Sequence, residues 1–316
     1  MKLLITGGAG FIGSHFLDFL TATATIENQI ENITIIDKLT YASNEKHLRI
    51  LTRNPRVNFL ELDICDRNTF STINGTYDFL VNFAAESHVD RSLKNPQVFA
   101  QTNVLGTCNL LDFVLEGRAK VFIQISTDEV YGSIENGSWS EECDLKPRSP
   151  YSASKASADL LALSYFTSFG LDVRITRASN NFGPRQHSEK MIPTIINSIV
   201  SNRPIPVYGS GHQIRDWLFV QDHVQGIWRV MKYGKKGQIY NLGGGTELTN
   251  LELIQKISEF FPNRDISLNH IEDRKGHDFR YSLDFSKASN DLGYFPEVSW
   301  ADGIVKTIEY YQGQSR

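Results

Sequence analysis

Short apolar runs alternate with amphipathic segments through about the first 180 residues of the chain. The strand-like runs are KLLIT, NITIID, VNFLELD, YDFLVNFA, KVFIQIS and LDVRITR, which begin at residues 2, 32, 57, 77, 120 and 171. Between them lie amphipathic stretches, at about 44–53, 95–117 and 149–170, whose spacing favours helices. Apolar strands that alternate with helices are typical of parallel sheets, so the pattern predicts an α/β fold with a doubly wound parallel sheet.

The alternation becomes irregular after about residue 180. Proline and glycine cluster in NFGPRQHSEKMIP (181–193) and in NRPIPVYGSGHQ (202–213). Ligands of doubly wound sheets bind at the carboxyl ends of the strands, so a second domain would cap that crevice. We expect a first domain over residues 1–180, to which the segment at about 214–242 returns. A smaller C-terminal substrate-binding domain is expected over 181–316.

The composition is that of an ordinary soluble globular protein. The 316 residues are 41% hydrophobic and 22% charged, and the formal net charge of −4 predicts no nucleic-acid partner. No apolar segment approaches the ~20 residues of a membrane span, so no membrane partner is expected either. Cys65, Cys108 and Cys143 are widely spaced and form no CxxC pattern. They predict reduced thiols in a cytoplasmic protein without a metal site.

A glycine-rich turn follows the first predicted strand. ITGGAGFIGSH places Gly7, Gly10 and Gly13 where backbone N–H groups can approach a pyrophosphate at a helix N-terminus, as in Rossmann-type folds. Asp37 ends the next strand and can accept a hydrogen bond from the adenosine ribose 2′-hydroxyl, which favours NAD over NADP. The alternative is that Asp37 caps the strand end. Asp63 is a candidate for the adenine edge or a solvated loop residue.

Tyr151 and Lys155 lie four residues apart in SPYSASK, on one face of a predicted helix. A cationic amine one turn away stabilises a phenolate, so it should lower the pKa of Tyr151 from about 10. Tyr151 could then accept the proton of an alcohol during hydride transfer. The alternative is an exposed pair at the front of an ordinary helix. The glycine turn, Asp37, and Ser126 or Thr127 on the preceding strand weigh against that alternative.

Two adjacent carboxylates, Asp128 and Glu129, follow the apolar run KVFIQIST. Their burial where a strand emerges is unfavourable, because each charged form loses solvation and repels the other. Two close carboxyl groups tend to titrate apart, so one can serve as a base while the other donates a proton. The alternative is a pair of loop residues, one bonded to the backbone and the other solvated.

Together these motifs resemble the extended short-chain dehydrogenase/reductase family, and within it the dTDP-glucose 4,6-dehydratases. The similarity runs from ITGGAGFIG to GHDFRYSLD and includes the TDE tripeptide at 127–129, which related epimerases generally lack. The resemblance implies an NAD-dependent lyase that oxidises C4 of dTDP-glucose, eliminates water across C5–C6 and reduces C6. Its product would be dTDP-4-keto-6-deoxyglucose, for deoxysugars such as rhamnose. A nucleotide-sugar 4-epimerase and a non-catalytic NAD-binding sensor remain as alternatives.

The resemblance also implies roles for individual residues. It assigns proton transfer at C5 to Glu129 and at C6 to Asp128, and Tyr151, Lys155 and Thr127 complete the expected catalytic set. The residues expected to bind NAD are Gly7, Gly10, Phe11, Ile12, Gly13, Asp37, Lys38, Thr40, Asp63, Ile64, Ala84, Ala85, Thr102, Tyr151, Lys155 and Asn181. Those expected to bind the nucleotide sugar are Ser87, Thr127, Asn180, Lys190, Pro206, Tyr208, Arg215, Asn250, Arg274 and His277.

The resemblance gives more specific expectations for some of these residues, and it includes one departure from the family pattern. Thr102 is expected beside the nicotinamide ribose. The cations Lys190, Arg215 and Arg274 suit a diphosphate whose charge enters a partly desolvated cleft. The family segment Arg-Pro-Gly-His reads RKGH here, with Lys275 in place of the proline.

A homodimer is expected from the predicted helices at about 97–116 and 150–169. In the second helix Ala156, Leu160 and Leu163 form one apolar stripe, and a further stripe is formed by Ala158, Leu161 and Tyr165. A helix that is apolar over most of its circumference should be buried on two sides. The second cover is either the chain's own C-terminal domain or, as the resemblance suggests, a helix bundle with a second copy.

Overall fold

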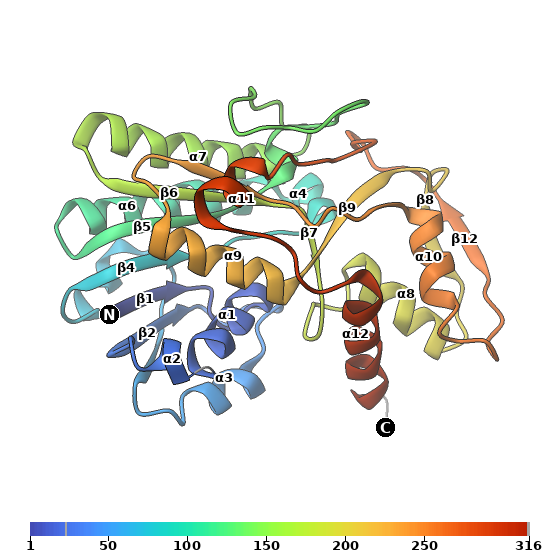
Figure 1. The fold of residues 1–316 in the computed structure, drawn as a ribbon, viewed down its shortest axis with the longest axis horizontal. Helices are drawn as coiled ribbons and strands as arrows, with labels where there is room; N and C mark the ends of the chain where they lie inside the picture. The colour runs from blue at the N-terminus through green and yellow to red at the C-terminus, as the bar shows by residue number, and fades with distance from the viewer. Residues whose placement is uncertain (23, 315–316) are drawn as a thin grey trace.

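A parallel sheet of seven strands forms the centre of the molecule, which we describe from a computed structural model over residues 1–22 and 24–314 (Figure 1). The strand order is β10-β6-β5-β4-β1-β2-β3, and each neighbouring pair is parallel. The strands are β1 (Lys2–Thr6), β2 (Asn32–Asp37), β3 (Val57–Glu61), β4 (Tyr77–Asn82), β5 (Ala119–Thr127), β6 (Asp172–Ala178) and β10 (Ile239–Leu242). The predicted doubly wound sheet is confirmed. Its order reverses between β1 and β4, which is where such sheets bind ligands.

Helices cover both faces of this sheet (Figure 1). On one face α1 packs against α9, with α11 beside α9, and on the other face α6 and α7 pack on β5. The elements around the sheet are α1 (Phe11–Ala22), α2 (Ala24–Glu27), α3 (Glu45–Leu51), the 3₁₀ helix η1 (Arg67–Thr72), α4 (Val89–Lys94), α5 (Pro96–Phe99), the π-helical η2 (Ala100–Leu105), α6 (Gly106–Leu115), the 3₁₀ turn η3 (Asp128–Val130), α7 (Pro150–Phe169), α9 (Val220–Tyr233) and α11 (Ser286–Leu292).

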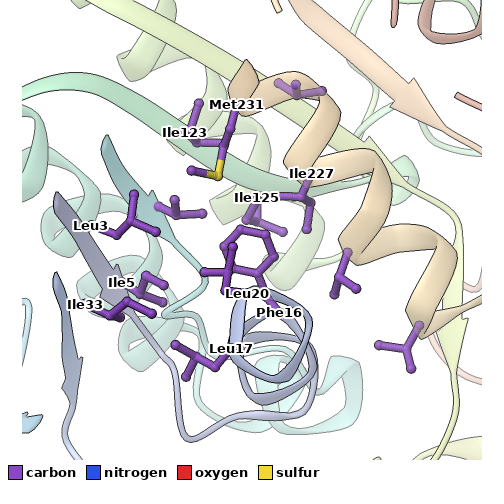
Figure 2. Packing of buried hydrophobic residues seen from close by; sticks show 14 of the residues in the cluster. Leu3, Ile5, Phe16, Leu17, Leu20, Ile33, Ile123, Ile125, Ile227 and Met231 are labelled. Atoms are coloured by element: carbon purple, nitrogen blue, oxygen red, sulfur yellow. The ribbon is translucent and has the colours of Figure 1, made fainter. Parts of the chain in front are cut away.

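Alternate residues of β1 supply the two cores on either side of the sheet. Leu3 and Ile5 point to the face covered by α1 and α9, where they join Phe16 and Ile227 (Figure 2). Leu4 points to the opposite face and belongs to the core under α6 and α7. Successive side chains of a strand point to opposite faces, so a strand buried on both sides has to be apolar at every position. This explains the uninterrupted apolar runs in the sequence.

A second, smaller set of elements lies beyond the carboxyl ends of these strands (Figure 1). It contains a three-stranded sheet of order β11-β9-β7 and a parallel pair, β8 with β12, around an apolar core of its own. Its elements are β7 (Asn180–Phe182), α8 (Met191–Val200), β8 (Ile205–Tyr208), β9 (Ile214–Phe219), β11 (Glu247–Thr249), α10 (Asn250–Ser258), β12 (Leu268–Ile271) and α12 (Trp300–Gln314).

The predicted returning segment at about 214–242 divides between the two parts. Its α9 packs on α1 and its β10 pairs with β6 at the edge of the large sheet. Its first strand, β9, pairs with β7 and β11 in the small sheet, although Leu218 of this strand belongs to the core of the large sheet. The domain boundaries themselves stay a prediction.

One helical stretch differs from the expectation that no apolar segment reaches membrane-spanning length. Within the part of the chain that the structure describes, Pro96–Leu115 is long and apolar enough, by length and composition, to cross a membrane. More than half of it is buried inside the fold, and α6 packs against β5 and α7. Its apolar character therefore fits a core helix, and Leu105 and Leu115 are among its exposed side chains.

Candidate active site

The two adjacent carboxyl groups lie at the carboxyl end of β5, in the short turn η3. Thr127 ends the strand, and its Oγ1 accepts a hydrogen bond from the backbone N–H of Glu129 (3.3 Å) and donates one to Asp128 Oδ1 (3.1 Å). The Asp128 side chain is buried, with 2% of the residue exposed, whereas Glu129 is half-buried and lines cavities. The alternative of a solvated loop pair therefore does not describe this turn.

The surroundings of Asp128 and Glu129 affect the pKa values of the two carboxyl groups differently. Burial raises the pKa of Asp128 well above its usual range, and the nearby carboxyl groups of Glu129 and Asp216 raise this pKa further. Burial also raises the pKa of Glu129, but the cations Arg215 and Lys190 act in the opposite direction. A close pair with such different surroundings favours a proton on Asp128 and a carboxylate at Glu129.

Asp216 is a contributor that sequence reasoning missed. It lies on β9, and its carboxylate accepts hydrogen bonds from Ser179 Oγ (2.5 Å) and from the backbone N–H groups of Gly244 (2.9 Å) and Thr246 (2.8 Å). Ser179 directly follows β6, whose register aligns its last residue with Thr127 of β5. No local pattern marks Asp216, because the packing of β9 against the end of the large sheet is what brings it close.

Tyr151 and Lys155 lie on the first turns of α7, which begins at a capping box formed by Ser149 and Ser152. Lys155 Nζ donates a hydrogen bond to the backbone carbonyl of Ile125 (2.6 Å) and so connects α7 to β5. Both side chains are buried and line the same cavity as the Asp128–Glu129 pair. The structure therefore brings the two predicted catalytic pairs together.

The expected effect of Lys155 on Tyr151 is not found. Burial raises the pKa of Tyr151, and the Glu129 carboxyl raises it further. Burial lowers the pKa of Lys155 to about 8, while Asp159 acts in the opposite direction. The prediction that the pKa of Tyr151 lies below its ordinary value is wrong for the protein alone, because desolvation of the phenol is the largest effect.

Two adjoining cavities at the carboxyl ends of the strands are lined by all the residues predicted to bind NAD. The first (about 100 Å³) lies beside Asp37 and Asp63, and the second (about 270 Å³) contains Tyr151 and Lys155. The glycine turn joins them: Gly7 has φ +67°, and a Cβ there would lie 2.6 Å from the backbone nitrogen of Ala84. Gly7 and Gly10 line both cavities beside the start of α1, so the residues present fit a dinucleotide whose pyrophosphate lies against this turn.

Asp37 serves the local structure as well as the first cavity. Its carboxylate accepts hydrogen bonds from the backbone N–H groups of Ala9 (3.0 Å) and Leu39 (2.9 Å) and from Ser43 Oγ (3.2 Å). Four lone-pair positions are available on a carboxylate, so one remains for a ribose hydroxyl. Asp63 accepts a hydrogen bond from the backbone N–H of Cys65 (2.9 Å) and lines the first cavity, but its side chain is 39% exposed, so the solvated-loop alternative stays open.

Thr102, which is expected to bind NAD, lines one of the two cofactor-side cavities. It lines the first cavity, with Asp37 and Asp63, and is absent from the lining of the second cavity, which contains Tyr151. The helix that carries it is packed against the loop after β3, where Asn109 Nδ2 donates to the backbone carbonyl of Ile64 (2.9 Å). Thr102 therefore lies on the same side as Asp63, and its place beside the nicotinamide ribose stays a prediction.

A third cavity, of about 280 Å³, lies between α4, α8, the small sheet and the loop before Asp278. We call it the nucleotide cavity. With the exception of Thr127, which lines the second cavity, its lining contains the residues predicted to bind the nucleotide sugar: Ser87, Asn180, Lys190, Pro206, Tyr208, Arg215, Asn250, Arg274 and His277. Glu129 lines both the second cavity and the nucleotide cavity, so the two spaces meet at the proposed base.

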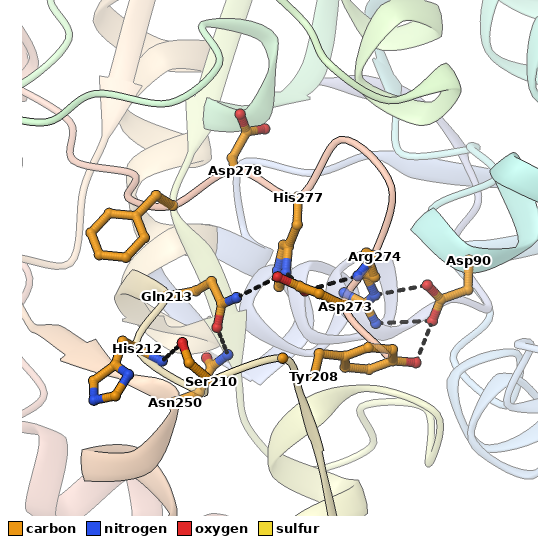
Figure 3. A network of polar contacts seen from close by, with 12 residues as sticks. Asp90, Tyr208, Ser210, His212, Gln213, Asn250, Asp273, Arg274, His277 and Asp278 are labelled. Carbon is orange, nitrogen blue, oxygen red and sulfur yellow. Dashed lines mark hydrogen bonds and ion pairs between the residues drawn. The ribbon is translucent and has the colours of Figure 1, made fainter. Parts of the chain in front are cut away.

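A polar network shapes one wall of the nucleotide cavity (Figure 3). Arg274 forms a two-point ion pair with Asp90 (2.7 and 2.9 Å), and Tyr208 Oη donates to the same carboxylate (2.9 Å). The Arg274 guanidinium lies over the Tyr208 ring, 4.1 Å from its centroid. His277 Nδ1 lies 2.6 Å from Asp273 Oδ1. Sequence reasoning missed Asp90, although its place in SHVDRS, beside the predicted Ser87, was a usable signal.

His223 was also missed, and it positions a predicted cofactor residue. Its ring is fully buried beside the second cavity, and burial lowers its pKa to about 3, so the imidazole is neutral. Nδ1 lies 2.8 Å from Asn181 Oδ1, which can only accept, so the histidine donates here. Among the described residues no group of three or more His, Cys, Asp or Glu side chains is arranged to hold a metal ion.

Comparisons with known proteins cover nearly the whole chain. The family model of GDP-mannose 4,6 dehydratase matches residues 4–307. The dTDP-glucose 4,6-dehydratase of Streptomyces antibioticus is 47% identical over 99% of this chain and 92% of that protein. Its Actinoplanes counterpart is 45% identical over 99% of this chain and 98% of that protein. The chain belongs to the dTDP-glucose 4,6-dehydratase family.

Solved structures support the dehydratase family over the related epimerases. DesIV, the dTDP-glucose 4,6-dehydratase of Streptomyces venezuelae solved with NAD and TYD bound, has a TM-score of 0.96, with 46% identity over 99% of this chain and 97% of its own. The UDP-glucose 4-epimerase of Thermotoga maritima has a TM-score of 0.89 and 28% identity, and each chain is covered completely. The fold is shared by both groups, and the dehydratases have the greater sequence identity.

Proposed function

We propose that the chain is an NAD-dependent lyase that converts dTDP-glucose into dTDP-4-keto-6-deoxyglucose for deoxysugar biosynthesis, including that of rhamnose. The observation that carries this proposal is the position of the Asp128–Glu129 pair. It lies with Tyr151 and Lys155 in the second cavity, which meets the nucleotide cavity at Glu129. A 4-epimerase needs no acid and base for C5–C6 elimination, and a sensor needs no catalytic groups at all.

The first step uses Tyr151, which removes the proton from the C4 hydroxyl while C4 is oxidised. Bound NAD supplies the hydride acceptor and a positively charged ring, whose charge opposes the effect of burial on the pKa of Tyr151. Lys155 is held beside the end of β5, because its Nζ donates a hydrogen bond to the Ile125 carbonyl (2.6 Å). Thr127 is the last residue of the same strand. Oxidation at C4 makes the C5 proton acidic, because the new ketone delocalises the carbanion.

Elimination and reduction then use the two carboxyl groups in turn. Glu129, as carboxylate, removes the C5 proton, and Asp128, as acid, protonates the C6 hydroxyl as it leaves as water. Glu129 then returns a proton to C5 while C6 receives the hydride. One proton has moved from the substrate to Tyr151 and one from Asp128 to the water. The resting state is therefore restored when a proton passes from Tyr151 to Asp128 through solvent.

The substrate diphosphate is assigned to the cationic part of the nucleotide cavity. Lys190, Arg215 and Arg274 line it, and all three also influence the carboxyl group of Glu129 electrostatically. The nucleoside then lies along Pro206 and Tyr208 on β8. The cations that bind the diphosphate would therefore also influence the pKa of Glu129, the proposed base.

Incubation of the purified protein with dTDP-glucose should yield a product that is lighter by one water, with no net consumption of nicotinamide cofactor. The reaction is redox-neutral overall, because the hydride removed from C4 returns to C6. Mass spectrometry of the product and absorbance of the reduced nicotinamide measure both quantities, with UDP-glucose as the comparison substrate. An unchanged mass with altered stereochemistry would indicate the epimerase, and no turnover would indicate the sensor. Stoichiometric consumption of cofactor would contradict the mechanism.

We also propose a homodimer formed through Pro96–Leu115 and α7. The buried side of α7 contains Ala156 and Ala158, whereas Leu160 on its outer side is 57% exposed. Leu105 on the neighbouring helix is 49% exposed. In Figure 1 these helices lie on the side of the large sheet opposite α1 and α9, and the small set of elements does not cover them. This arrangement favours a second copy as the cover over the chain's own C-terminal part.

The double substitution Leu105→Glu, Leu160→Glu should convert the dimer into a monomer at micromolar concentration. Charges at the centre of an apolar interface lose solvation without gaining partners. Mass by light scattering checks the result. Ile50→Glu is the matched control, because Ile50 is 57% exposed on the distant α3 and should leave the mass unchanged. A monomeric mass for the unaltered protein would refute the dimer.

A cytoplasmic location is the remaining part of the proposal. Cys65, Cys108 and Cys143 are free thiols, which fits a reducing compartment. NAD and nucleotide sugars are also the expected ligands of such an enzyme. Fractionation of cells that produce the protein tests the location.

A further inference from the structure

Glu129 lines a third space besides the second cavity and the nucleotide cavity. This space, which we call the side cavity, has a volume of about 80 Å³. Ser149, Asp278 and Tyr281 form part of its wall, and Lys275 and Gly276, which are exposed, lie on its lining as well. The side cavity therefore extends from the proposed base to residues at the protein surface.

The lining of the side cavity is polar and includes a buried hydrogen-bond acceptor that has no donor among the described residues. Asp278 is 3% exposed, and its Oδ2 accepts a hydrogen bond from Tyr281 Oη (2.7 Å). Its Oδ1 lies 3.4 Å from Arg148 and accepts no hydrogen bond from any described residue. A polar space of this size has room for several waters, and buried polar groups are normally hydrogen-bonded.

The side cavity adjoins the nucleotide cavity and shares with it Asn180, Arg215, Arg274 and His277, whereas Ser149, Lys275, Gly276, Asp278 and Tyr281 line the side cavity alone. Figure 3 shows that His277 and Asp278, although adjacent in the chain, point to opposite sides of their loop. His277 points toward the network of Asp273 and Arg274, whereas Asp278 points away from it. Asp278 is also absent from the lining of the nucleotide cavity. The part of the side cavity around Ser149, Asp278 and Tyr281 lies outside the residues assigned to the nucleotide sugar and NAD.

We propose that the side cavity is a water-filled path through which Glu129 exchanges its proton with solvent while the substrate is bound, and that Asp278 holds the waters in it. The inference rests on the proposed function. Glu129 takes the C5 proton and passes it to a water of the path, and a solvent proton returns to Glu129 before it protonates C5. No bond other than those to this proton forms or breaks. Lys275 and Gly276 mark the outer end of the path.

The isotope content of the product tests this path. A single turnover of dTDP-glucose in D₂O, with protein in excess, should place deuterium at C5 in most of the product, because Glu129 exchanges before it returns the proton. Asp278→Asn keeps the size of the side chain and an acceptor for Tyr281 but loses the carboxylate. It should still dehydrate the substrate, with a severalfold lower fraction of deuterium at C5 as measured by NMR or mass spectrometry. A residue with a merely structural role would change the rate and leave this fraction unchanged.

Two further variants complete the test. Asp273→Asn is the matched control on the same loop, because its carboxylate faces Gln213 and His277. It should raise the KM for dTDP-glucose and leave the deuterium fraction as in the unaltered protein. Tyr281→Phe removes a hydroxyl group from the side cavity but keeps the ring under Arg215. It should also lower the deuterium fraction at C5. This variant replaces Asp278→Asn in the test if Asp278→Asn does not fold.

The failures of the two proposals are distinguishable. Dehydrated product from the unaltered protein without deuterium at C5 overturns the path alone. The path is also overturned if Asp278→Asn and Tyr281→Phe, where they fold, give the same deuterium fraction at C5 as the unaltered protein. Absence of any dehydrated product from the unaltered protein overturns the proposed function, and the path with it.

Discussion

Glu129→Gln should leave the protein able to oxidise C4 of dTDP-glucose but unable to complete the dehydration. The amide keeps nearly the same shape and leaves Tyr151 and Lys155 in place, but it cannot take the C5 proton. Loss of a well-placed general base typically costs about 10²–10⁴-fold in rate. Mixing the variant with substrate should therefore produce absorbance of reduced nicotinamide without release of dehydrated product. Exchange of solvent deuterium into C5 should be lost as well.

Glu141→Gln is a suitable control for this substitution. Glu141 accepts a hydrogen bond from the backbone N–H of Asn241 (2.7 Å) and lines none of the cavities at the site. The same exchange of carboxylate for amide there should leave dehydration intact. If Glu129→Gln dehydrates dTDP-glucose at a rate close to that of the unaltered protein, the role assigned to the TDE tripeptide is wrong.

Tyr151→Phe should stop the reaction one step earlier. The ring can keep its edge contact with Phe99, 6.3 Å between centroids, but the oxygen that accepts the C4 hydroxyl proton is gone. A loss of about 10²–10⁴-fold is expected here too, now with no absorbance of reduced nicotinamide. Stopped-flow absorbance after mixing with dTDP-glucose distinguishes this block from that in Glu129→Gln.

The control for the tyrosine lies on the same helix. Tyr165 donates a hydrogen bond to Asp112 (2.6 Å), and Tyr165→Phe should leave the oxidation rate unchanged. Rapid formation of reduced nicotinamide by Tyr151→Phe would move the role of base to another residue. Asp128 and Thr127 would then be the groups to examine, because they line the same cavity.

The parts of the fold that depend on neighbouring residues in the chain were predictable. The strands β1 and β2 begin and end at the predicted residues, since apolar runs bounded by polar and glycine residues define them locally. The predicted helix at 95–117 is interrupted by a π-helical turn, Ala100–Leu105, for which the sequence has no local signal. The close approach of this helix to the loop after β3, where a Cβ on Gly106 would lie 2.5 Å from Ile64 Cδ1, is a tertiary feature that local patterns do not contain.

The same distinction holds for the site. Tyr151, Lys155, Asp128 and Glu129 could be predicted because each pair is close in the chain. Asp216 could not, because it reaches the site only through the packing of β9. The direction of the Tyr151 pKa was also beyond the sequence, since it depends on how far the phenol is desolvated. Charges can be counted along a chain, whereas burial is a property of the folded molecule.

The contact between Asp90, Arg274 and Tyr208 has a consequence for the thermodynamics of ligand binding. An arginine that moves freely loses conformational entropy when it binds a phosphate, and each immobilised side chain of this kind costs ~0.5–1.5 kcal/mol. Arg274 has already lost that freedom, because the ion pair and the Tyr208 ring hold it in one place before any nucleotide arrives. The same carboxylate also competes with the diphosphate for the guanidinium. Asp90 therefore makes the binding of the nucleotide less costly in entropy and, at the same time, limits how tightly the product is held.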